Sequence, residues 1–281
     1  MMRADGLKTL THRLNGTLIA LTVPGTRMAE QYPHYIEFRH VYKTFDYPVL
    51  VDANFYVDGG ETVAIIGRSG VGKSVSLAHI MGFLKPDQGN VIVAHQDITG
   101  FREAELREIR KKVTMVFQSG ALFDSLTVAE NVLFSLELND DYDKQNREDV
   151  VMGLLRLVGL ENAAEQYPSD LSTGYKRAVA IARALAAQPE CILYDEPTTM
   201  VDPIMSDHVA RLMQRLKEQL HLTSVVVTHD LDLMRAVADK VVVLHEGGVI
   251  YFGAVSELAN SDHPHIREFL AMDRTLLSSN G

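Results

Sequence analysis

The first clear pattern along the chain is an alternation of apolar and polar residues in two short stretches, 36–39 and 53–57. Such alternation is typical of strands with one buried face. Turn-forming residues separate and follow these stretches, namely Asp46, Pro48 and the run Asp-Gly-Gly at 58–60. We expect a small β region over this part of the chain.

Continuous apolar runs of strand length recur through the rest of the chain, with helix-compatible segments between several of them. These runs are 62–66, 113–117, 191–194, 224–227 and 241–244. A run without alternation is typical of a strand that is buried on both faces. Together with the intervening helices, it predicts a parallel sheet covered on both sides. The pattern therefore predicts an α/β fold.

The strand signals disappear between residues 121 and 187. Thr127 and Glu130 have the spacing of a capping box, which begins a helix. The segments 150–158 and 176–187 are also helical in pattern. We therefore predict a helical subdomain that is inserted into the sheet domain.

The composition is typical of a globular protein and argues against nucleic acid as a partner. The 281 residues are 46% hydrophobic and 23% charged, which is enough to build a large core. A formal net charge of −10 argues against a protein that holds nucleic acid by excess positive charge, so no nucleic acid is expected as a partner. The richest basic stretch alternates with glutamates, as on a solvated helix face: Arg102, Arg107, Arg110, Lys111 and Lys112 with Glu103, Glu105 and Glu108.

The cysteine and the apolar stretches bear on the compartment. Cys191, the single cysteine, stands in an apolar run, which predicts a buried thiol and a reducing compartment. No stretch approaches the roughly 18 apolar residues of a spanning helix, so we expect that the chain does not cross a membrane by itself. Lys8 and Arg13 precede a short apolar piece, 18–23, which weakly imitates a secretory signal. We expect residues 1–35 to be a poorly ordered extension, or a start codon assigned too far upstream.

A glycine-rich loop follows the apolar run 62–66 and leads into a helix-compatible stretch, 74–83. Its sequence, Gly-Arg-Ser-Gly-Val-Gly-Lys-Ser, satisfies the P-loop pattern in the strand-to-helix context that the pattern requires. Backbone N–H groups of such a loop surround a β-phosphate, the lysine reaches the β and γ oxygens, and the serine offers a hydroxyl to Mg²⁺. An accidental match in a chain this long has a probability of about one per cent. We expect ATP and Mg²⁺ to be bound by Gly67, Arg68, Ser69, Gly70, Val71, Gly72, Lys73 and Ser74.

The apolar run 191–194 ends in two acids, Asp195 and Glu196. Ligands of open α/β sheets gather at the carboxyl ends of the strands. Asp195 is expected to hold Mg²⁺, directly or through water. Glu196 is expected to orient the attacking water or take its proton. Alone, such a strand end is more often an ordinary turn, but the P-loop upstream favours the functional interpretation.

Residues 171–177 read Leu-Ser-Thr-Gly-Tyr-Lys-Arg and precede a strongly helix-forming run. Ser172 is a natural N-cap, and a helix start is an anion site. The segment resembles the ABC signature, Leu-Ser-Gly-Gly-Gln, and the chain from about 36 to 270 resembles an ABC cassette throughout. That resemblance implies a P-loop NTPase (RecA-like) fold with an antiparallel β subdomain and a helical subdomain at about 121–187. Residues 1–35 would precede the cassette, and 271–281 would form a C-terminal tail.

The resemblance also implies a second cassette, expected to be a second copy of this chain, arranged head to tail. Ser172 and Gly174 of one subunit would then meet the ATP held by the P-loop of the other. The pair would sit beneath an integral membrane permease, peripherally on the cytoplasmic face of a bacterial inner membrane. In this arrangement the cassette hydrolyses ATP to ADP and phosphate and couples the reaction to transport.

Further site residues follow from the same resemblance. Gln118 resembles the Q-loop glutamine, which touches Mg²⁺ and takes part in catalysis, and His229 resembles the switch histidine that faces the γ-phosphate. Asp202 resembles the D-loop aspartate. Phe45 stands where an adenine-stacking aromatic is expected, although Tyr47 is close enough to compete.

Two positions depart from the family's signature. Thr173 replaces its first glycine and Tyr175 replaces its glutamine. The added Cβ of Thr173 falls where the backbone is tight, so the departure bears on the hydrolysis rate. Ser172 and Gly174 are retained.

The segment 116–128 follows Gln118 and faces the permease in this family. Its core, Gln-Ser-Gly-Ala-Leu-Phe, resembles the ATPases of MCE-type, Mla-like phospholipid transporters. On this resemblance we expect phospholipid transport across the bacterial envelope, with an MCE-domain lipid-binding protein as a partner. The C-terminal stretch 266–277 would reach the other cassette.

Three alternatives remain open at this stage. One is the cassette of an amino-acid or methionine importer, because many importer cassettes carry Ala-Leu-Phe in the same segment. Another is a soluble ABC ATPase of translation or DNA repair, which would normally carry a second cassette or a long coiled-coil insertion. A P-loop kinase would leave the signature, Gln118 and His229 unexplained.

Overall fold

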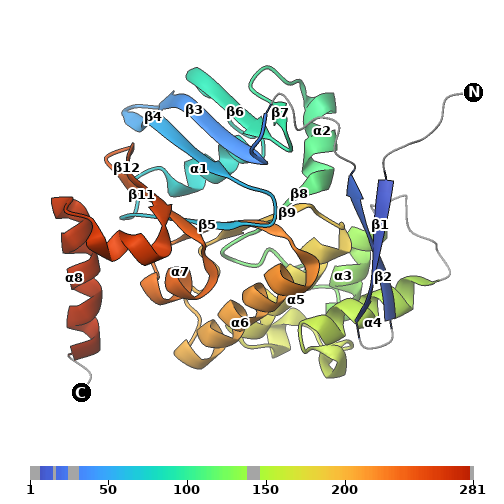
Figure 1. The fold of residues 1–281 in the computed structure, drawn as a ribbon. Coiled ribbons are helices and arrows are strands. Elements are labelled where there is room, and N and C mark those ends of the chain that lie inside the picture. The colour runs from blue at the N-terminus through green and yellow to red at the C-terminus, as the bar shows by residue number, and fades with distance from the viewer. Residues whose placement is uncertain (1–6, 15–16, 25–31, 138–145, 279–281) are drawn as a thin grey trace, which may run out of the picture.

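The computed structural model describes residues 7–14, 17–24, 32–137 and 146–278. A six-stranded sheet in the order β12-β11-β5-β10-β9-β8 forms its centre (Figure 1). The strands run parallel except β12, which is antiparallel to β11 at the edge. Their bounds are Thr62–Ile66 for β5, Val113–Val116 for β8, Cys191–Asp195 for β9, Thr223–Thr228 for β10, Lys240–His245 for β11 and Gly248–Ala254 for β12. The predicted parallel sheet is confirmed, whereas β12 was not foreseen.

The central strands are buried on both faces, which explains their continuous apolar runs. Successive side chains of a strand point to opposite faces. On β5, Val63 and Ile65 face one apolar cluster, and Ala64 and Ile66 face another. The first cluster includes α1 (Lys73–Ile80) and α2 (Glu103–Lys112). The second includes α7 (Leu231–Val237), the 3₁₀ helix η4 (Val255–Asn260) and α8 (Pro264–Ser278).

A separate antiparallel sheet in the order β4-β3-β6-β7 lies over α1 (Figure 1). Its buried face includes the rings of Phe38 and Phe55, which stack at 4.4 Å between centroids. The predicted β region is confirmed in β3 and β4, while the pattern did not indicate the other two strands. The bounds are Ile36–Thr44 for β3, Pro48–Val57 for β4, Gln88–Val93 for β6 and Gln96–Asp97 for β7.

The inserted helical part packs around one apolar cluster, which it shares with α6 and with the faces of β9 and β10 away from α1. Its predicted capping box is confirmed. The Thr127 backbone N–H donates to Glu130 Oε2 at 2.7 Å, and the Glu130 N–H donates to Thr127 Oγ1 at 3.2 Å. The helices of this part are α3 (Val128–Glu137), α4 (Arg147–Leu157), η2 (Glu161–Ala163), η3 (Pro168–Asp170) and α5 (Thr173–Ala186), and the neighbouring α6 is Pro203–Leu220.

Part of the N-terminal segment forms regular structure, which the interpretation of 1–35 as a poorly ordered extension did not include. Strands β1 (Leu7–Leu14) and β2 (Thr17–Pro24) pair antiparallel, with Leu7 opposite Pro24. The short apolar piece that imitates a secretory signal lies in β2. Its Ile, Val and Thr residues are common in strands, which gives a physical reason for the difference.

At the other end, α8 continues to Ser278 and so includes most of the expected tail. The cassette bounds of 36–270 stay a prediction. No helix among the described residues is long and apolar enough to span a membrane.

Candidate functional site

The P-loop joins β5 to α1 and relies on glycine at two points of close contact. A Cβ at Gly67 (φ +155°) would lie 2.5 Å from the Leu244 carbonyl oxygen. A Cβ at Gly72 (φ +106°) would lie 2.7 Å from the Val49 carbonyl oxygen. Both backbone conformations also favour glycine. The loop is therefore wedged between β11 and β4 and keeps a fixed curve before α1 begins.

Lys73 extends back into this curve. Its side chain is only 8% exposed, and Nζ donates to the carbonyl oxygens of Gly67 at 2.9 Å and Arg68 at 3.1 Å. The same ammonium lies 3.6 Å from Glu196 Oε1. The structure thus holds one cation inside the P-loop, opposite Glu196, the acid that directly follows β9.

Ser74 and Asp195 meet at the carboxyl edge of the sheet although 121 positions separate them. The Ser74 hydroxyl donates to Asp195 Oδ1 at 3.1 Å. Burial raises the pKa of Asp195, and it is the largest of the causes. The hydrogen bond from Ser74 lowers this pKa. The negative charge of Glu196 raises it, and the positive charge of Lys73 lowers it. A hydroxyl and a carboxylate oxygen at one point are ligands that suit Mg²⁺, which commonly takes one or two carboxylates and completes its shell with phosphates and water. The residues present therefore fit this metal.

Glu196 follows β9 in a left-handed backbone conformation, with φ +49°. Its backbone N–H donates to the Val227 carbonyl at 2.8 Å, which ties it to β10. On the side chain, Oε2 lies 2.8 Å from His229 Nδ1 and accepts the Thr199 hydroxyl at 3.1 Å. A non-glycine residue in this region costs about 1–3 kcal/mol and persists only where surrounding contacts enforce it. Here those contacts aim the carboxylate at His229.

These five side chains form one group, which we call the P-loop cluster: Lys73, Ser74, Asp195, Glu196 and His229. The cluster comes from α1, the end of β9 and the residue that follows β10. Two of its members are exposed, Ser74 and His229, and the side chain of His229 is 61% exposed. The structure thus brings together five residues that the sequence predicted from three separate segments.

The remaining predicted residues lie outside the P-loop cluster. Ser172 caps α5 as expected, because its hydroxyl accepts the Tyr175 N–H at 3.4 Å. Asp202 caps α6, where Oδ1 accepts the Met205 N–H at 3.0 Å. Gly174 packs against the same helix, since a Cβ there would lie 2.5 Å from Met205 Cβ. We call Ser172, Gly174 and Asp202 the signature face.

Gln118 and the aromatic candidates are exposed. Gln118 comes shortly after β8, whose Val116 pairs with Tyr194 of β9, so it lies at the same sheet edge as the P-loop cluster. Phe45 and Tyr47 occupy the turn between β3 and β4 and are 52% and 61% exposed. The turn is close to the P-loop because β4 begins there and its Val49 contacts Gly72.

Two residues that contact Glu196 or the turn after it were not predicted from the sequence. Thr199 stands three residues after Glu196, a spacing at which a hydroxyl in a turn often bonds back, so the sequence carried a weak signal for it. Arg177 is buried at 3% exposure, and it donates to the carbonyls of Pro197 at 3.2 Å and Thr199 at 3.5 Å. Those partners are 20 and 22 positions away, so no local pattern indicates them.

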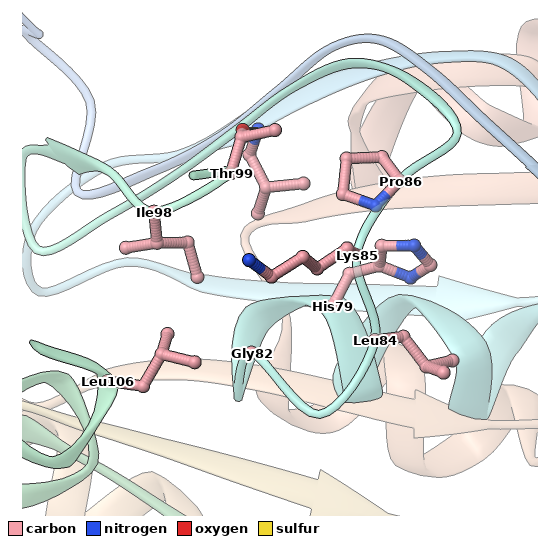
Figure 2. A pocket seen from close by; sticks show the side chains of 9 residues that line it. His79, Gly82, Leu84, Lys85, Pro86, Ile98, Thr99 and Leu106 are labelled. Atoms are coloured by element: carbon pink, nitrogen blue, oxygen red, sulfur yellow. Dashed lines mark hydrogen bonds between the residues drawn. The ribbon is translucent and has the colours of Figure 1, made fainter. Parts of the chain in front are cut away.

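A small cavity of about 10 Å³ lies at the opposite end of α1 from the P-loop (Figure 2). His79 lines it together with the loop after α1 and Leu106 of α2. His79 Nδ1 lies 2.7 Å from the Val75 carbonyl, so Nδ1 carries the proton, and Nε2 is buried without a hydrogen-bond partner among the described residues. Burial lowers the pKa of His79. With room for no more than about one water, this cavity cannot hold a nucleotide.

The family follows from a direct comparison. Residues 50–199 match the sequence profile described as ABC transporter, and the chain belongs to this family. It is an ABC-type ATPase, which binds ATP with Mg²⁺ and hydrolyses it. The predicted cassette fold is confirmed.

Two curated relatives illustrate the similarity. The chain is 42% identical over 228 residues to the methionine import ATP-binding protein MetN 2 of Rhodococcus jostii, covering 79% of this chain and 67% of the relative. It is 38% identical over 244 residues to the methionine import ATP-binding protein MetN 1 of Pseudomonas savastanoi pv. phaseolicola, covering 85% and 73%. Both relatives are therefore longer than the region they share with this chain.

Two solved structures have the same fold. One is the dimeric, post-hydrolysis state of the cassette MJ0796 bound to ADP and Pi, with a TM-score of 0.71, 32% identity and coverage of 78% of this chain and 98% of that one. The other is cbiO1 from Clostridium perfringens, part of the ABC transporter complex cbiONQ, with a TM-score of 0.75, 26% identity and coverage of 85% and 99%.

The comparisons correct the expected substrate. The phospholipid interpretation, and with it the MCE-domain partner, is wrong, because the curated relatives are named methionine import proteins. That interpretation rested on six residues near Gln118. A match so short discriminates poorly within a family whose members share their architecture, and the similarity over more than 220 residues outweighs it.

Proposed function

We propose that this chain is the ATP-hydrolysing subunit of a methionine importer. The observation that carries the proposal is the identity of 36–42% with methionine import ATP-binding proteins from three genera, Rhodococcus, Corynebacterium and Pseudomonas, over 79% or more of this chain. The amino-acid importer was an open alternative on sequence grounds, and the relatives favour it.

The P-loop cluster supports specific roles for its members. The P-loop N–H groups and Lys73 hold the β and γ phosphates of ATP, because one ammonium faces the curve of the loop. Glu196 accepts the proton of the attacking water as its oxygen bonds to the γ-phosphorus and the bond to ADP breaks. His229 donates Nδ1–H to Glu196 Oε2 and so orients the carboxylate, and its ring lies at the exposed edge of the cluster, where the γ-phosphate is expected.

Ser74 and Asp195 would hold Mg²⁺, and Gln118 would join them from the end of the neighbouring strand. When bound, the metal neutralises charge on the β and γ phosphates. The chain's own contribution is the fixed hydroxyl and carboxylate pair, already 3.1 Å apart. Phe45 stacks on the adenine from the turn beside Gly72, with Tyr47 as the competing ring.

The signature face serves the nucleotide of a second copy. Ser172 and Asp202 are exposed and belong to helices other than α1, and MJ0796, a cassette of the same fold, is dimeric. A helix N-terminus with a hydroxyl cap suits a phosphate. Two copies arranged head to tail therefore give two complete sites.

The permease partner has a surface to occupy. A groove of about 260 Å³ separates the core from the helical part, between α2, β8 and α5. Exposed aromatic residues border this region, including Phe83 and Phe117, while Phe123 and Phe134 pack edge to face at 4.8 Å nearby. Because cbiO1 is part of a larger transporter complex, we place this chain peripherally on the cytoplasmic face of the membrane, with a permease and a methionine-binding receptor as partners.

The test is reconstitution of the assembly. The chain is co-purified with a permease and a methionine-binding receptor from the same genome, placed in lipid vesicles, and assayed for ATP hydrolysis with L-methionine or with glutamate. Methionine is expected to stimulate hydrolysis and glutamate is not. The same assembly carrying Glu196→Gln serves as the control and should respond to neither. Stimulation by another substrate with no response to methionine overturns the proposal and leaves the ATPase assignment intact.

A further inference from the structure

Arg177 is a buried cation that forms no ion pair with any of the described residues. It lies in the first turns of α5 with 3% of its surface exposed, and no carboxylate among the described residues pairs with it. Burial lowers the pKa of its guanidinium. Burying a charge is costly unless its hydrogen bonds are well used, so a residue of this kind needs a geometric reason for its place.

The partners of Arg177 supply that reason. Its Nε donates to the Pro197 carbonyl at 3.2 Å, and one terminal nitrogen lies 3.5 Å from the Thr199 carbonyl. Both carbonyls belong to the turn that directly follows Glu196. The guanidinium therefore spans this turn from the side of α5, with two donors on one rigid plane.

The far side of the same turn holds the Glu196 carboxylate. The Thr199 hydroxyl donates to Glu196 Oε2 at 3.1 Å, and the Thr199 N–H donates to the Glu196 carbonyl at 3.3 Å. Thr199 is thus fixed by Arg177 through its carbonyl and contacts Glu196 through its hydroxyl. The left-handed backbone of Glu196 persists only because surrounding contacts enforce it. If this turn became less rigid, the carboxylate would no longer be held in its position beside His229.

The helix that carries Arg177 also carries Ser172 at its N-cap. Further along α5, Arg183 donates to the carbonyls of Gly120 at 3.0 Å and Ala121 at 2.6 Å, just after Gln118. Two arginines therefore attach α5 to the turn after Glu196 and to the loop after Gln118. If α5 moved, these hydrogen bonds would move both the turn after Glu196 and the loop after Gln118.

We propose that Arg177 is a positioning residue for ATP hydrolysis, which holds the turn 197–199 so that Thr199 keeps the Glu196 carboxylate in place. In this way the signature helix of a subunit is tied to the base of that same subunit. The inference rests on the role proposed for Glu196. It does not depend on the transported substrate.

The test separates positioning from binding and from folding. Arg177→Met keeps an unbranched chain of similar length but removes the donors. We expect kcat for ATP to fall by about ten- to a hundred-fold, as for a small misplacement of a reacting group. KM for ATP and the affinity for a non-hydrolysable ATP analogue should stay within about two-fold, because the P-loop is untouched. Arg215→Met, on the exposed face of α6, is the matched control and should leave kcat unchanged.

A double-mutant cycle tests the route through Thr199. Thr199→Ala removes the hydroxyl that contacts Glu196 and should also lower kcat with little effect on KM. If Arg177 acts through Thr199, the double variant should be no slower than the slower single variant. Independent, multiplying losses would overturn the proposed route.

The conservative variant Arg177→Lys is the control that distinguishes a loss of positioning from misfolding of Arg177→Met. Lysine keeps the charge and one donor, so it should recover part of kcat while KM stays constant. An unchanged kcat in Arg177→Met, or parallel losses of kcat, nucleotide affinity and melting temperature that Arg177→Lys does not relieve, would overturn positioning. Full turnover by Glu196→Gln would instead remove the role of Glu196 itself, so the two failures are distinguishable.

Discussion

The P-loop cluster and the signature face are built in different ways. In the cluster, side chains from α1, β9 and the end of β10 contact one another, and Lys73 and Glu196 are both largely buried. In the signature face, Ser172 and Asp202 bond only to the first turn of their own helices, among the described contacts, and remain exposed. One half of the site is thus assembled within the chain, and the other half is presented outward. The difference favours a site that needs two copies.

Glu196→Gln should have the largest effect, because it should nearly abolish hydrolysis in the P-loop cluster while the signature face still engages the nucleotide of the partner copy. The amide keeps the size of the side chain but cannot accept a proton, so hydrolysis should fall by about a hundred- to ten-thousand-fold. Nucleotide binding should survive, and ATP should then hold two subunits together. Steady-state hydrolysis, equilibrium binding of ATP and size-exclusion chromatography measure the three effects. Lys73→Ala is the contrasting variant and should lose binding as well, because the P-loop loses its buried ammonium.

Mixing two defective subunits sharpens the comparison. Ser172→Arg damages the signature face, and Lys73→Ala damages the P-loop cluster. A heterodimer pairs one intact cluster with one intact signature face, so the mixture should regain part of the activity that each variant lacks. Hydrolysis is measured after the variants are mixed and heterodimers are verified by differential tags. A mixture that forms heterodimers yet stays inactive would contradict the two-copy site.

Gly174→Ala probes the packing of the signature face. Its Cβ would lie 2.5 Å from Met205 Cβ, so α5 and α6 would have to separate. We expect the free energy of unfolding to fall by about 1–3 kcal/mol, the usual cost of overpacking. Urea denaturation measures the change. Gly100→Ala is the control, since nothing lies within 4 Å of its Cβ, and should stay within about 0.5 kcal/mol of wild type. Equal losses in both variants would argue against the contact.

His79, at the far end of the helix that begins at Lys73, should give the smallest effect. Its pKa is lowered in the folded state, so below its ordinary value of about 6.5 the unfolded chain binds more protons. The stability linked to His79 is therefore complete above pH 6.5 and declines as the pH falls below it, by at most about 1.4 kcal/mol per unit of pKa difference. Urea denaturation at pH 8 and pH 5.5 should show a smaller decline for His79→Leu than for wild type. Identical declines would contradict a buried neutral imidazole.

Much of the fold was predictable because its signals are local. The apolar runs that became β5, β8, β9, β10 and β11, and the capping box before α3, depend on residues within a few positions of one another. The antiparallel pairing of β1 with β2 and the edge strand β12 were missed, since their pairing depends on a partner strand more than on a distinctive pattern. The substrate was predicted wrongly from the segment 116–128. Apart from Gln118, that segment contacts neither the nucleotide site nor the substrate in the proposed arrangement.

By itself, the sequence determined the α/β fold, the P-loop and the acids that end β9, because each is a short pattern whose meaning lies in neighbouring residues. The tertiary structure decided which of these residues meet. Ser74 reaches Asp195 across 121 positions and Lys73 reaches Glu196 across a comparable span, since the order and register of parallel strands bring their ends to one edge. Only the tertiary structure showed that the side chain of Arg177, five residues after Ser172, is buried and hydrogen-bonds to the turn after Glu196. A buried guanidinium is recognised by the carbonyls that surround it, and only the packing of α5 against the sheet places them there.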